Sequence, residues 1–194
     1  MFLWMRASLL SAGGTAVFGL SAVAVAGAGA GPPAQPIVVP CADAIYVAGS
    51  AVPRPVRAVT AGPVVFNSLA HLTSPRSLER PQKALPFFVV KSPTTVLARA
   101  GRTVVVTLVR GGQNVRLLYG RKWLGRLSSW HYRLAEVPAS VRLETCRDKK
   151  NRSLTTQYAG GFLLRKPGCV TLEVRVSGEA RKHRASIRLG VPHC

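Results

Sequence analysis

Apolar and polar residues alternate along much of the second half of the chain. Over 170–176, valine and leucine occupy every second position, and polar residues fill the positions between them. The same period of two recurs over 185–191, and the polar stretch 177–184 separates the two segments. A period of two sends alternate side chains to opposite faces of a strand. The pattern therefore predicts a β-hairpin with a polar loop and one face in a core.

Further short apolar runs precede this hairpin, and Gly and Pro turns separate them. Many short strands at a spacing of roughly ten residues are typical of an all-β sandwich or barrel. Only 71–84 has room for a helix, and Pro75 and Pro81 keep it short. We expect an all-β fold: a single antiparallel β-sandwich domain over 41–194, immunoglobulin-like in general architecture. The other expected strands are 63–69, 86–90, 94–98, 115–119, 129–134, 141–144 and 102–110, the last covered on both faces.

Residues 1–30 have the order of a secretory signal peptide. Arg6 precedes the uncharged run 7–26, and three small-x-small sites follow within 24–30. An uncleaved anchor is the alternative, because a run of this length can span a bilayer. The cleavage sites favour removal of a helical signal peptide, leaving no stable membrane span and a flexible, Gly/Ala/Pro-rich lead-in over 31–40. We therefore expect a secreted or cell-surface protein.

Basic residues far outnumber acidic ones. The chain has 27 Lys and Arg against 7 Asp and Glu, and only Arg6 of the basic residues lies in 1–30, so the remainder carries +19. So few carboxylates exclude acid-rich calcium loops and disfavour paired-carboxylate catalysis. A charge this large favours contact with a polyanion.

Four cysteines, an even number in an exported chain, predict two disulfides. The sequence has no C-x-x-C pair, and four cysteines allow three pairings. Cys146 and Cys169 flank one short stretch, whereas Cys41 opens the expected domain and Cys194 is its last residue. We predict Cys146–Cys169 as a local bridge and Cys41–Cys194 as an end-to-end bridge.

Turn motifs accompany these cysteines. They are Gly160-Gly161-Phe162, Pro167-Gly168-Cys169-Val170 and Gly190 before Cys194. In these motifs the C-terminal third resembles uncharacterised secreted bacterial β-sandwich proteins with four cysteines. The resemblance implies a fold and a compartment but no activity.

Motifs for catalysis or metal binding are missing from the sequence. It has neither G-x-S-x-G nor S-x-x-K with a later K-T-G, and its four histidines lack H-x-H or H-E-x-x-H spacing. We therefore predict no catalytic residue, no metal and no cofactor. A small extracellular hydrolase, with a site that only the fold assembles, is kept as an alternative.

Basic residues gather in three stretches. In 121–133 they alternate with aromatic residues, an arrangement that suits a polyanion or a sugar ring, unless the aromatic face is core. Trp123 lies in a turn region and is expected to be exposed. The clusters 147–152 and 181–184 fall in expected loops, the second at the hairpin tip. The candidate polyanion-binding residues are Arg121, Lys122, Trp123, Arg126, Lys149, Lys150, Arg152, Arg181, Lys182 and Arg184.

These patterns favour a non-enzymatic exported β-sandwich protein at the cell surface that contacts anionic envelope polymers or a protein partner. An extracellular nucleic-acid or anionic-lipid binder is a second alternative to the hydrolase. A contiguous basic face with an exposed tryptophan would favour that binder, and a cleft with a buried His–acid pair would favour the hydrolase.

Overall fold

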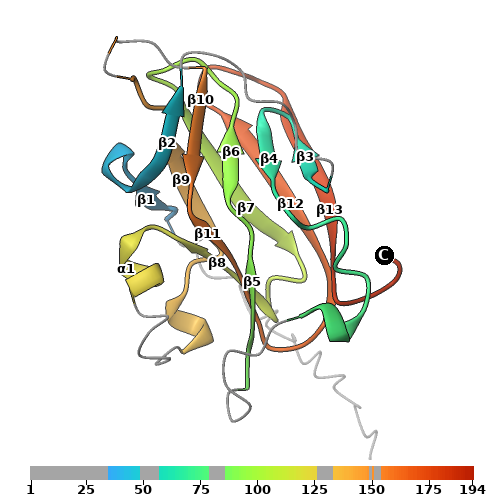
Figure 1. Ribbon diagram of the computed structural model, residues 1–194. Coiled ribbons are helices and arrows are strands. Elements are labelled where there is room, and N and C mark those ends of the chain that lie inside the picture. The colour runs from blue at the N-terminus through green and yellow to red at the C-terminus, as the bar shows by residue number, and fades with distance from the viewer. Residues whose placement is uncertain (1–34, 49–56, 79–85, 126–132, 149, 151–153) are drawn as a thin grey trace, which may run out of the picture. The chain divides into compact units, whose positions relative to one another are not determined.

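Two layers of β-sheet enclose one hydrophobic core in the computed structural model of the protein (Figure 1). The described residues belong to one compact unit, Ala34–Cys194. The structure describes residues 35–48, 57–78, 86–125, 133–148, 150 and 154–194.

Sheet A forms one layer. Its neighbouring strands pair antiparallel, except that β1 runs parallel to β9. In spatial order the strands are β1 (Ile37–Val39), β9 (Ser140–Glu144), β7 (Thr103–Arg110), β12 (Gly168–Val176) and β13 (Lys182–Leu189).

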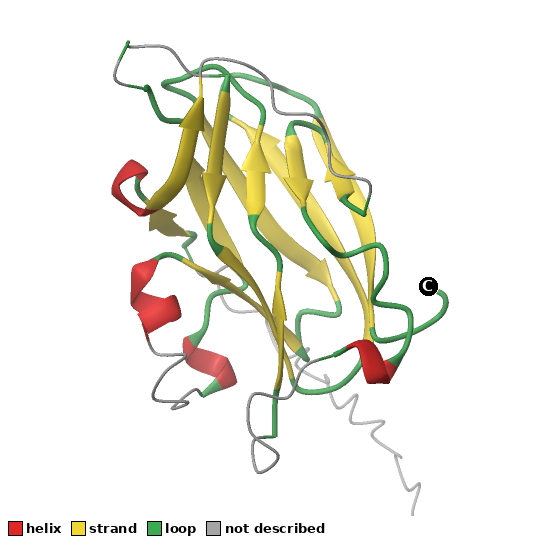
Figure 2. Ribbon diagram, in the orientation of Figure 1, coloured by secondary structure: helices red, strands yellow, loops and turns green. Residues whose placement is uncertain are grey.

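Sheets B and C together form the other layer (Figures 1 and 2). Strand β5 leads into β6 through Ser92 and Pro93, and β10 leads into β11 through Ala159. The Ser92 backbone N–H donates to the Gly160 carbonyl at 2.8 Å, which joins the two sheets at the bend. Sheet B contains, in spatial order, β2 (Ala44–Ala48), β10 (Thr155–Tyr158), β6 (Thr94–Val96), β4 (Val64–Phe66) and β3 (Val59–Ala61). Sheet C contains β5 (Phe88–Lys91), β11 (Gly160–Leu164) and β8 (Val115–Tyr119).

Short helical elements flank the sheets. Trp123 and Leu134 pack with Leu118 and Leu163 in a second hydrophobic cluster, so sheet C is covered on its outer face as well. The helical elements are η1 (Cys41–Asp43), η2 (Pro75–Ser77), α1 (Arg121–Gly125) and η3 (Leu134–Glu136).

The main core follows the expected alternation. Val104 and Val106 of β7 point inward and are at most 1% exposed, and Phe66 of sheet B meets Phe162 of sheet C at 6.2 Å between ring centroids. The outward residues of β7, such as Val105, are only half-buried. The prediction that both faces of 102–110 are covered is therefore wrong, whereas the all-β, sandwich-like fold is confirmed.

The C-terminal hairpin is confirmed as β12 and β13, but β13 begins at Lys182 and includes most of the predicted basic loop. Within the expected lead-in, Ile37–Val39 is strand β1, and Val39 is completely buried. The expected signal peptide 1–30 lies outside the described residues, as does most of the expected strand 129–134.

The two disulfides are Cys41–Cys146 and Cys169–Cys194, so the predicted pairing is wrong. Strand topology explains the difference. Because β1 and β9 run parallel, with Val39 beside Leu143, the residues that follow both strands come out at the same end of sheet A. That brings Cys41 to Cys146. Cys169 lies opposite Arg188 in the C-terminal hairpin, and the chain turns back after β13 to bring Cys194 to it.

Candidate functional site

The outer face of sheet A carries most of the charge found in the strands. Six basic side chains project from it, and all six residues are exposed. We call this set the basic face: Arg110, Arg142, Arg175, Lys182, Arg184 and Arg188.

Strand register brings these cations together. Arg175 is directly opposite Lys182 on the neighbouring strand, and on its other side Val105 separates it from Arg142. Residues directly opposite share a face, and like charges in that position are destabilising. The pairing of Arg175 with Lys182 therefore opposes folding locally, unless an anion offsets it.

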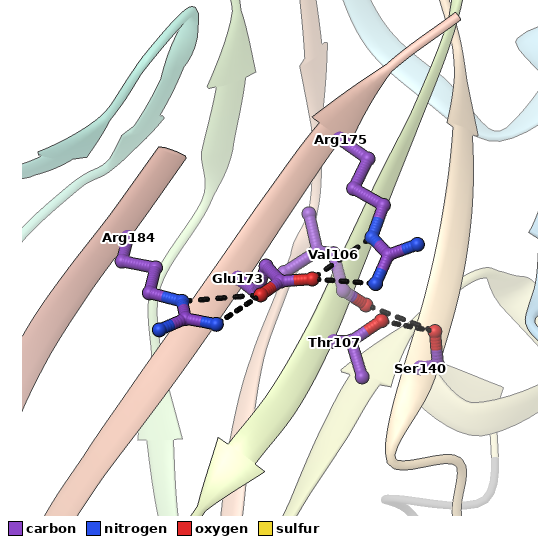
Figure 3. A network of polar contacts seen from close by, with 6 residues as sticks. All are labelled: Val106, Thr107, Ser140, Glu173, Arg175 and Arg184. Carbon is purple, nitrogen blue, oxygen red and sulfur yellow. Dashed lines mark hydrogen bonds and ion pairs between the residues drawn. The ribbon is translucent and has the colours of Figure 1, made fainter. Parts of the chain in front are cut away.

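Glu173 supplies part of this compensation (Figure 3). Its carboxylate accepts from Arg175 Nε at 2.8 Å through one oxygen and from Arg184 Nη2 at 2.7 Å through the other. The Glu173 side chain is only 4% exposed, whereas those of the arginines are 60% and 65% exposed. The carboxylate is thus covered by two guanidinium groups that still face solvent.

Arg184, followed by Arg175, lowers the pKa of the Glu173 carboxyl below its usual range, against the opposing effect of burial. The group therefore stays ionised under mildly acidic conditions. The basic face holds one other carboxylate, Glu144, at the end of β9, which accepts the backbone N–H of Cys41 at 3.0 Å. Six cations and two carboxylates leave the face with a net charge of +4.

Hydroxyl groups line the same face next to Glu173. Thr107, which is paired with Glu173 across the strands, bonds to Ser140 at 2.8 Å, and Ser140 donates to the Val106 carbonyl at 3.3 Å (Figure 3). Thr171 and Ser186 face each other one row further along β12 and β13. Short neutral side chains between long cations leave the guanidinium and ammonium groups accessible.

The prediction that Trp123 is exposed is wrong. Residue Trp123 is 3% exposed, because α1 turns it onto the outer face of sheet C beside Leu118. Lys122 Nζ lies 5.2 Å from the centroid of its ring. Trp123 is therefore core, and the described part of 121–133 offers no stacking platform.

Arg121 is already bound within the protein. Its Nε lies 3.1 Å from Asp43 Oδ1, and its Nη2 donates to the Ala42 carbonyl at 2.7 Å. These contacts fasten α1 to η1 beside the Cys41–Cys146 disulfide. Arg121 therefore has a structural role that its position in a basic stretch did not reveal.

The predicted loop clusters are only partly described. Arg181 is exposed in the hairpin loop, and Lys150 is exposed after β9, with its backbone N–H on Asp148. Lys182 and Arg184 lie on strand β13 instead of a loop. Three predicted residues lie outside the described part of the chain: Arg126, Lys149 and Arg152.

Four cations of the basic face were not among the predicted site residues: Arg110, Arg142, Arg175 and Arg188. Arg142 and Arg175 occupy polar positions within segments whose alternation was already visible. A search for basic residues at outward positions of consecutive strands would have found them. The order of the strands in the sheet, which makes these residues neighbours, cannot be read from that pattern.

The hydrolase alternative gains no support from the described residues. A hollow of about 290 Å³ is lined by His71, Ser77 and Lys91 among others, without an Asp or Glu, and Ser77 Oγ donates to the Ser74 carbonyl. The His–carboxylate pair of His183 and Glu179, at 3.7 Å, lies at the surface. Within the described ranges, no three His, Cys, Asp or Glu side chains gather as a metal site.

No protein-family model matches the chain, and no significant match exists to a curated protein or to a solved structure. Two disulfides are typical of extracellular proteins. In the described part of the chain, no helix is both long and apolar enough to cross a membrane.

Proposed function

We propose that the protein is an exported, non-enzymatic β-sandwich protein of the cell surface that binds anionic envelope polymers through its basic face. One observation carries the proposal: a row of cations across sheet A, in which Arg175 and Lys182 are directly opposed. An arrangement that opposes folding is stabilised when an anion binds to it.

The row suits a linear polymer that crosses the strands. Neighbouring strands lie about 4.8 Å apart, so Arg142 and Arg175, two strands apart, are separated by about 10 Å and Lys182 adds about 5 Å. Successive anionic groups of a phosphate, sulfate or carboxylate polymer can each meet one cation. Arginine also forms paired hydrogen bonds to such groups.

The burial of Trp123 removes the stacking contribution that this residue was expected to make to a single-stranded nucleic acid. Binding then depends on charge. The logarithm of the binding constant should fall linearly with the logarithm of the salt concentration, because binding releases counterions from the polymer.

The test uses soluble sodium polyphosphate with neutral dextran as the blank. The double variant Arg142→Gln/Lys182→Gln removes two exposed cations of the basic face and keeps Arg175 and Arg184, the two that bond to Glu173. We expect it to weaken polyphosphate binding at low salt by about tenfold or more and to reduce the salt slope by about two.

The matched control, Arg57→Gln/Arg76→Gln, removes the same charge from exposed residues outside sheet A and should change affinity far less. Equal losses in both double variants would show that net charge, rather than this face, attracts the polymer. Binding that is insensitive to salt would refute the proposal. Parallel titrations with alginate and single-stranded DNA rank carboxylate polymers and nucleic acid against polyphosphate.

A further inference from the structure

The outer face of sheet B carries a second, chemically different hollow. It measures about 200 Å³ and is lined by Tyr46, Thr95, Thr155 and Gln157. Tyr46, Gln157 and Thr95 are direct cross-strand neighbours on β2, β10 and β6. The site is therefore built on three consecutive strands.

The strands of this sheet carry no charge. None of the residues in the five strands of sheet B is Asp, Glu, Lys, Arg or His, although the chain has 27 Lys and Arg. An ionic ligand would lose its hydration here without gaining a counter-charge. The hollow therefore selects for uncharged ligands.

The polar groups of the hollow are prepared for hydrogen bonding. Thr95, only 8% exposed, accepts the Asn67 amide at 3.2 Å and the Gln157 amide at 3.4 Å through its hydroxyl oxygen. A hydroxyl has two lone pairs and one hydrogen, so after these two bonds the Thr95 hydrogen is left to donate to a ligand. The Gln157 carbonyl oxygen remains an acceptor beside it.

An aromatic ring completes the hollow. Tyr46 is 48% exposed, although a tyrosine usually hides most of its ring. A ring of this kind has an apolar face and a polar end, and suits ligands that share that combination. The hollow lies below the range of about 300–1,000 Å³ typical of drug-sized ligands, so it fits a single ring.

We infer that this hollow binds an uncharged sugar residue of a glycan, with the ring on Tyr46 and its hydroxyl groups on Thr95 and Gln157. A sugar ring presents C–H groups on its faces and hydroxyl groups that donate and accept around its rim. Neutrality, size, the aromatic face and the unpaired hydrogen-bonding groups all match it. This site is separate from the basic face and does not depend on it.

The test is a titration of the ¹⁵N-labelled protein, with both disulfides intact, by NMR. The probes are maltotriose, cellotriose and tri-N-acetylchitotriose, each raised through the millimolar range. We expect at least one of them to shift amide signals of β2, β6 and β10 in a saturable way, equally at low and high salt. Polyphosphate should instead shift signals of β12 and β13.

Variants locate the binding. Tyr46→Ala and Gln157→Ala should each weaken trisaccharide binding by about tenfold, because the first removes the aromatic face and the second removes a hydrogen-bonding group. Ile45→Ala, at an exposed neighbour that does not line the hollow, should leave affinity within about twofold. Retained signal dispersion in each variant shows that the fold is intact.

Three results would overturn the inference. The first is that none of the three trisaccharides shifts these amides. The second is that Ile45→Ala weakens binding as much as Tyr46→Ala. The third is that dilution alone shifts the β2, β6 and β10 signals, which would mean that a second copy of the chain covers this face.

Discussion

Sheets A and B pack their inner faces on one core, but their outer faces differ in charge. The outer face of sheet A carries six cations and a buried carboxylate, whereas the strands of sheet B carry no charged residue. Three strands of sheet A are also longer, with eight or nine residues in β7, β12 and β13 against three to five in the strands of sheet B. Within the strands of these two sheets, charge therefore gathers on the outer face of sheet A, and the two faces are suited to different ligands.

The two disulfides hold different parts of this arrangement. Cys41–Cys146 joins the crossing between β1 of sheet A and β2 of sheet B to the end of β9, whereas Cys169–Cys194 ties the C-terminal tail to sheet A. The separations are 105 and 25 residues. In the loop-entropy model, Cys41→Ala/Cys146→Ala should lower the free energy of unfolding by about 5 kcal/mol and Cys169→Ala/Cys194→Ala by about 3.5 kcal/mol.

Urea denaturation followed by circular dichroism measures both losses, with peptide mapping under non-reducing conditions to establish the pairing. A larger loss in Cys169→Ala/Cys194→Ala would show that the bridge to the C-terminal tail contributes more to stability than the bridge near β1 and β9. A Cys41–Cys194 peptide would contradict the topology itself.

Alanine substitutions at two glycines, one in each layer, test how tightly the backbone is packed there. A Cβ at Gly161, where β11 pairs with β5, would overlap the Val90 carbonyl oxygen, whereas a Cβ at Gly168 at the start of β12 meets no atom. Gly161→Ala should cost about 3 kcal/mol, because backbone has to move. Gly168→Ala should be neutral or stabilising by about 0.5 kcal/mol, because it restricts the unfolded chain. Thermal and urea denaturation of the two variants make the comparison; equal midpoints would contradict it.

The smallest expected change in stability comes from Glu173, the buried carboxylate of the basic face. Glu173→Gln should lower the free energy of unfolding at neutral pH by about 1 kcal/mol, since its arginine partners are solvent-screened. Because the pKa of Glu173 is lowered in the folded state, its contribution is complete above the unfolded value of about 4.3 and disappears as pH falls through the folded value.

The difference between the wild type and Glu173→Gln should therefore be constant from pH 7 to about 5 and shrink below about 4. Glu136→Gln is the control, because its 3.8 Å ion pair with Arg133 joins two exposed side chains. A pH-independent difference for Glu173→Gln would mean that the side chain acts by packing alone. Denaturant midpoints measured across this pH range decide the question.

Local pattern predicts part of this fold well. The β12–β13 hairpin is visible in its alternation, because its two strands are neighbours in sequence and a short loop fixes their register. Strand β1 has only three residues, and its partner β9 lies about a hundred residues away, so no local signal marks the pairing. The disulfide prediction failed for the same reason.

The candidate site is harder to predict than the fold. Lys182 and Arg184 were recognised as basic but assigned to a loop, because the basic run hid the alternation that begins at Lys182. Trp123 was assigned to the surface because its turn looked exposed, and only the packing of α1 on sheet C buries it. Residue type indicates which chemistry is available, whereas the order of strands decides which side chains meet.

The disulfide connectivity also bears on the order in which the chain is made. Cys41 pairs with Cys146 and Cys169 pairs with Cys194, so each cysteine is joined to its next neighbour along the sequence. A chain that emerges N-terminus first presents the first correct partner for Cys41 before either competing thiol has appeared. Oxidation in the order of emergence then gives the native bridges directly, without the thiol–disulfide exchange that interleaved pairings require.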